Sequence, residues 1–127
     1  MFDLKKILNG RMNVPEPEKY VAGVDIAPGT ALKLASGKLA VCGATEAPAY
    51  ISMGVAKADA LCPVAAVEHN QLYETEVTAA PTSLKVGDKV TISADGLGVT
   101  ATTTSGVATI VSLDGATKAG DKITVRF

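Results

Sequence analysis

Lys85-Val86-Gly87-Asp88-Lys89-Val90-Thr91-Ile92 recurs with small changes as Lys118-Ala119-Gly120-Asp121-Lys122-Ile123-Thr124-Val125. In both copies a Gly-Asp pair precedes a segment in which polar and apolar residues alternate. Glycine takes positive φ at little cost and aspartate accepts hydrogen bonds from nearby backbone, so the pair predicts a turn. The alternation that follows predicts a half-buried β-strand. The repeated phrase therefore indicates a β-rich fold.

Similar turn and strand signals continue through the chain from Val21 onward. Ser36-Gly37 separates two alternating segments, 31–34 and 38–41, and so predicts a hairpin. Further strands are expected at residues 50–56, 61–67, 72–78, 97–101 and 107–113. Short strands with turn signals every 8–12 residues are typical of sandwiches and barrels. We therefore predict an all-β fold, a small β-sandwich or barrel-like domain over residues 21–127.

The first twenty residues differ from this body. Four apolar residues have a spacing that would place them on one side of a short helix: Phe2, Leu4, Ile7 and Leu8. Asn9-Gly10 would end that helix, and Pro15 and Pro17 then favour an extended path. We predict an N-terminal arm over residues 1–20 that carries a short helix. The alternative is a disordered or loosely packed terminus.

Composition limits the classes of function. The 127 residues are enough for one domain, and with no Trp, two Phe and three Tyr the core must be mostly aliphatic and alanine-rich. Such a thin core favours further burial against other subunits. The net charge of −1, from scattered charges, and the dispersed aromatics argue against a nucleic-acid partner. No apolar run is long enough for a membrane span, and the N-terminus lacks a signal-peptide pattern, so we expect cytoplasmic synthesis.

No residue set predicts catalysis, a metal site or a cofactor. His69 is the only histidine, and neither Cys42 nor Cys62 stands at ligand spacing from it or from the other. We interpret His69 as a surface loop residue and the cysteines as free, partly buried thiols, although a disulfide between them is geometrically conceivable. Glu74 and Glu76 share one strand face, which we interpret as solvated or inter-subunit rather than catalytic. We expect a non-enzymatic protein.

The body resembles the head-decoration (cement) proteins of tailed bacteriophages, the lambda-type group and its relatives. The similarity begins in the hairpin Pro28-Gly29-Thr30-Ala31-Leu32-Lys33-Leu34-Ala35-Ser36-Gly37-Lys38-Leu39-Ala40-Val41. It continues in Ile51-Ser52-Met53-Gly54-Val55-Ala56 and in Leu72-Tyr73-Glu74-Thr75-Glu76-Val77. The closing segment from Gly120 to Phe127 is similar to the end of related head proteins.

This resemblance implies a β-tulip-like domain that trimerises on the outer capsid surface and stabilises the expanded head of the virion. It also implies a late protein whose N-terminal arm binds the major capsid protein. The apolar and aromatic arm residues are the expected contacts: Phe2, Leu4, Ile7, Leu8, Met12, Val14 and Tyr20. The alternative is a capsid-surface or fibre-base module that recognises host-surface glycans, although clustered aromatics and acids are few. A carrier or small enzyme is the third hypothesis; against it, Lys89 and Lys122 follow their turns instead of occupying the tips.

Overall fold

The computed structural model describes residues 1–8 and 17–127, and within these residues it contains strands and no helix. Five strands of one sheet follow the order β1 (Asp3–Ile7), β7 (Gln71–Val77), β11 (Lys122–Arg126), β10 (Ala108–Ser112) and β8 (Lys89–Val90). The short β9 (Gly98–Val99) pairs with β7 in parallel. The second sheet has the order β2 (Glu18–Val21), β6 (Leu61–Ala66), β5 (Tyr50–Ser52), β3 (Ala31–Ala35) and β4 (Lys38–Val41). The predicted all-β class is confirmed.

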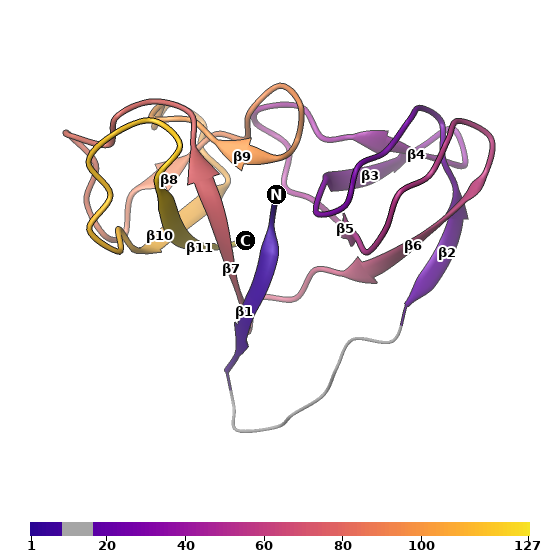
Figure 1. Cartoon of the computed structure of the whole chain (residues 1–127), viewed down its shortest axis with the longest axis horizontal. Coiled ribbons are helices and arrows are strands. Elements are labelled where there is room, and N and C mark those ends of the chain that lie inside the picture. The colour runs from indigo at the N-terminus through magenta and orange to yellow at the C-terminus, as the bar shows by residue number, and fades with distance from the viewer. Residues whose placement is uncertain (9–16) are drawn as a thin grey trace.

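The two sheets occupy separate halves of the molecule (Figure 1). We call residues 17–66 the barrel lobe, because its sheet closes on itself. A parallel bridge joins Ala22 to Leu39, and the Gly23 N–H donates to the Leu39 carbonyl at 2.8 Å, so the chain just after β2 meets β4. We call residues 1–8 and 67–127 the sheet lobe. Its strand β1 lies beside β7, on the side of the molecule that faces the barrel lobe (Figure 1).

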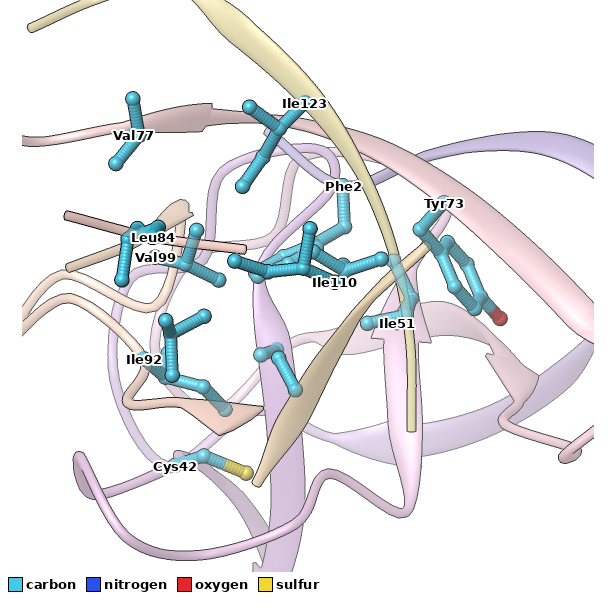
Figure 2. Close-up of a cluster of buried hydrophobic side chains, with 14 residues drawn as sticks. Phe2, Cys42, Ile51, Tyr73, Val77, Leu84, Ile92, Val99, Ile110 and Ile123 are labelled. Carbon is cyan, nitrogen blue, oxygen red and sulfur yellow. The ribbon is translucent and has the colours of Figure 1, made fainter. Parts of the chain in front are cut away.

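Two apolar clusters form the core. The smaller one fills the barrel with Ala22, Ile26, Leu32, Leu39, Ala56, Cys62 and Val64. The larger one lies in the sheet lobe, and Figure 2 shows Ile110, Ile123, Val99 and Ile92 within it. Ala31, Cys42 and Ile51 of the barrel lobe also belong to this larger cluster. The two lobes therefore share buried apolar surface.

The repeated Gly-Asp phrase forms the same turn twice. Gly87 and Gly120 have φ values of 95° and 86°, in the region that favours glycine. Asp88 Oδ2 accepts from the Lys85 N–H at 2.8 Å, and Asp121 Oδ2 accepts from the Lys118 N–H at 3.0 Å. The turn prediction is confirmed, and so is the hairpin of β3 and β4. The strand expected over 50–56 ends at Ser52, and the one expected over 97–101 is only β9.

The predicted N-terminal helix is wrong. The segment instead forms β1, which pairs antiparallel with β7 through Leu4 opposite Tyr73 and Ile7 opposite Gln71. A helix of seven or eight residues is marginal in isolation, whereas the open edge of β7 offers backbone hydrogen bonds along the whole segment. Cys42 and Cys62 are free and buried, in agreement with the predicted thiols.

Candidate interaction surface

The residues predicted to bind a partner do not lie on one surface. Phe2 is only 2% exposed and packs in the larger cluster, so its side chain has no surface to offer. Leu4 is 41% exposed, while Ile7 and Leu8 are half-buried. Tyr20 belongs to β2 and packs against the barrel interior. Met12 and Val14 lie outside the described residues.

Backbone and side-chain contacts fix the N-terminus between the lobes. The Phe2 N–H donates to the Gly29 carbonyl at 2.9 Å, and the Met1 amino group donates to the Leu97 carbonyl. Gly29 has a φ of 71°, and the Met1 side chain occupies the place where a Cβ of residue 29 would stand. Residues 1 and 2 thus contact both lobes.

A β-bulge in β1 places the Lys5 side chain across the outer face of the sheet. The register shifts between Leu4 and Lys6, and the intervening Lys5 places its Nζ 2.9 Å from Thr124 Oγ1, 3.3 Å from Asp114 Oδ2 and 3.5 Å from Glu74 Oε2. Asp114 also accepts from the Thr124 and Ser112 hydroxyls, and these hydrogen bonds hold the pKa of its carboxyl below the usual value. This network ties β1 to β7 and β11.

The most exposed apolar side chains of the barrel lobe lie on its outer face. Met53, Val55 and Leu61 are 48%, 70% and 62% exposed. The Met53 N–H donates to the Pro63 carbonyl at 2.9 Å, one step beyond the last β5–β6 pair of Ser52 with Val64, and the chain then bends at Gly54. Leu61 pairs with Val21 of β2. We name this set the apolar strip: Val21, Met53, Val55, Leu61 and Pro63.

The charged residues of the barrel lobe mostly neutralise one another. Lysine Nζ atoms lie within 2.5 to 2.7 Å of a carboxylate in three ion pairs: Lys33–Glu46, Lys38–Asp59 and Lys57–Asp25. All three are at the surface, so each contributes little to stability. Lys19, which lies opposite Pro63 in the β2–β6 pair, is exposed and belongs to none of these three ion pairs.

The aromatic residues, dispersed in the sequence, meet in space. Tyr20 and Tyr50 have ring centroids 5.2 Å apart, with the Tyr50 hydroxyl donating to the Tyr20 hydroxyl at 3.3 Å. The Tyr20 hydroxyl donates to Glu18 Oε2 at 2.6 Å, and this hydrogen bond raises the pKa of the Tyr20 phenol. No local signal in the sequence identifies this tyrosine pair, because the two tyrosines are far apart in the chain and lie on β2 and β5, which are separated by β6 in the sheet.

His69 and the two cysteines do not form a metal or catalytic site in the part of the chain that the structure describes. His69 is exposed, with Nδ1 3.0 Å from the Phe127 carbonyl oxygen. Burial, assisted by the Glu46 carboxylate, raises the pKa of the Cys42 thiol to about 11, which keeps it protonated. Across residues 1–8 and 17–127, no group of three or more His, Cys, Asp or Glu side chains is placed to hold a metal ion. The same residues include no helix able to cross a membrane.

The sequence matches no model of a known protein family and no curated protein sequence. The fold is similar to that of a solved structure, the N base of the head fibre gp8.5 of bacteriophage phi29, with a TM-score of 0.66 and 15% sequence identity. The match covers 90% of this chain and 94% of that one, so it takes in both lobes. At this identity the likeness establishes a shared fold. The resemblance to lambda-type decoration proteins is not confirmed by it.

Proposed function

We propose that this chain is a structural protein of a tailed-phage virion that binds the outer surface of the capsid. The observation that carries the proposal is the fold, shared across both lobes with the base of a head fibre. The short motifs that resemble cement proteins lie in β3–β4, in and after β5, and in β7.

The surface chemistry supports binding rather than catalysis. Within the described residues no His, Cys, Asp or Glu cluster could hold a metal ion, whereas Met53, Val55 and Leu61 are exposed and β1 is an edge strand. Apolar patches and open strand edges are the means by which proteins add to one another's surfaces. On a repeating lattice, many weak contacts of this kind give strong attachment.

In the cement form of the proposal, the chain trimerises and stabilises the expanded head against the pressure of packaged DNA. The major capsid protein is its main partner. Of the predicted contacts, Leu4, Ile7, Leu8 and Tyr20 retain side-chain surface for this role, and Met12 and Val14 remain predictions. Such a protein needs no cofactor, nucleic acid or membrane, and it would be made in the host cytoplasm.

The second candidate is a fibre base or capsid-surface module that recognises host glycans. Two observations favour it: the shared fold is that of a fibre base, and Tyr20, Tyr50 and Glu18 form an aromatic–acid cluster. Aromatic faces next to a carboxylate suit the apolar face and hydroxyl groups of a sugar ring. This cluster is the feature that the sequence alone did not indicate.

Capsids of the encoding phage, made without this chain, test the proposal. Purified protein is mixed with expanded capsids, and the particles are sedimented through a sucrose cushion. We expect saturable co-sedimentation at a fixed copy number per particle. Protein that stays in the supernatant at every concentration would refute capsid binding.

Heating distinguishes the two forms of the proposal. DNA-filled heads with and without the chain are warmed, and DNA release is followed with an intercalating dye. A cement protein raises the release temperature, whereas binding without any change in that temperature supports the fibre-base form. A glycan array screened with wild-type protein and a Tyr50→Ala variant then tests recognition of sugars.

A further inference from the structure

We draw no further inference here: the strongest candidate, the row of cations that Lys6, Arg126 and Lys89 form across the strands of the sheet lobe, carries nothing, because β9 closes that sheet by pairing with β7 and with the segment after β8, so the row runs around the lobe instead of lying on one surface, and nothing in the structure shows what covers it.

Discussion

The rings of Phe2 and Phe127 meet edge to face, with centroids 5.4 Å apart and planes inclined by 62°. The Phe127 ring also lies 5.9 Å from that of Tyr73 on β7. Figure 2 shows Phe2 and Tyr73 in the same buried cluster. Three of the five aromatic residues thus join the two ends of the sheet lobe, and the N-terminal segment is part of the folded core.

This arrangement predicts a large effect of a substitution at Phe2. Replacement by alanine removes a buried aromatic ring and leaves a cavity, so Phe2→Ala should lower the free energy of unfolding by about 3–5 kcal/mol. Leu4→Ala, in the same strand but exposed, should cost less than about 1 kcal/mol. Urea denaturation followed by circular dichroism measures both. Equal effects at the two positions would show that Phe2 is not in the core.

Alanine substitutions at Gly87 and Gly106 should differ in how much they destabilise the fold. Gly87 has a positive φ and open space where a Cβ would stand. Gly87→Ala should therefore lower the free energy of unfolding only by the conformational penalty, about 1–2 kcal/mol. A Cβ at Gly106 would collide with the Lys89 carbonyl, and a backbone atom cannot move aside cheaply. Gly106→Ala should therefore be the more destabilising change in thermal unfolding. The reverse order would contradict the close approach at Gly106.

Acid should destabilise the fold through its hydrogen-bonded carboxylates. Hydroxyls of Thr124 and Ser112 hold the pKa of Asp114 below its ordinary value of 3.8, and backbone N–H groups of Thr117 and Lys118 do the same for Asp121. A carboxyl with a lowered folded-state pKa stabilises the fold above its unfolded pKa, and this stability is lost as the pH falls through the folded value. The melting temperature should therefore fall as the pH drops below about 4. Asp114→Asn and Asp121→Asn should each make the melting temperature depend less on pH in this range.

The thiols should be unreactive in the folded protein. With the pKa of Cys42 at about 11, only about one thiol in ten thousand is ionised at neutral pH, and burial blocks reagents. An aromatic disulfide reagent should label Cys42 and Cys62 only as the chain unfolds. Serine at either position should lower the free energy of unfolding by about 1–3 kcal/mol and leave capsid binding unchanged. Fast labelling of the native protein would reveal an open or activated thiol.

The sequence was most informative where structure is local. The turns at Gly87-Asp88 and Gly120-Asp121 and the hairpin at Ser36-Gly37 depend on neighbouring residues, and all three were predictable. The N-terminal segment was not predictable, because its strand form depends on Tyr73 and Gln71, which the chain supplies much later. A chain without residues 1–18 would therefore expose the β7 edge as well as lose its predicted partner contacts.

The candidate surface was predictable only in part. The alternation of Ile51, Met53 and Val55 indicates one strand face, but it does not reveal that the sheet lobe covers Ile51 and stops short of Val55. The Tyr20–Tyr50 contact likewise depends on both strands flanking β6. Short-range patterns identify faces, whereas the coverage of a face depends on how distant segments pack.

The early position of β1 in the chain has a consequence for synthesis on the ribosome. Residues 17–66 contain every strand of the barrel, so this lobe can close as soon as it emerges. Strand β1 emerges earlier still, but Lys5 and its partner Thr124 are 119 positions apart. Strand β1 and Phe2 can therefore complete their packing only after β7 and residues 124–127 have been synthesised, so the sheet lobe closes later than the barrel lobe.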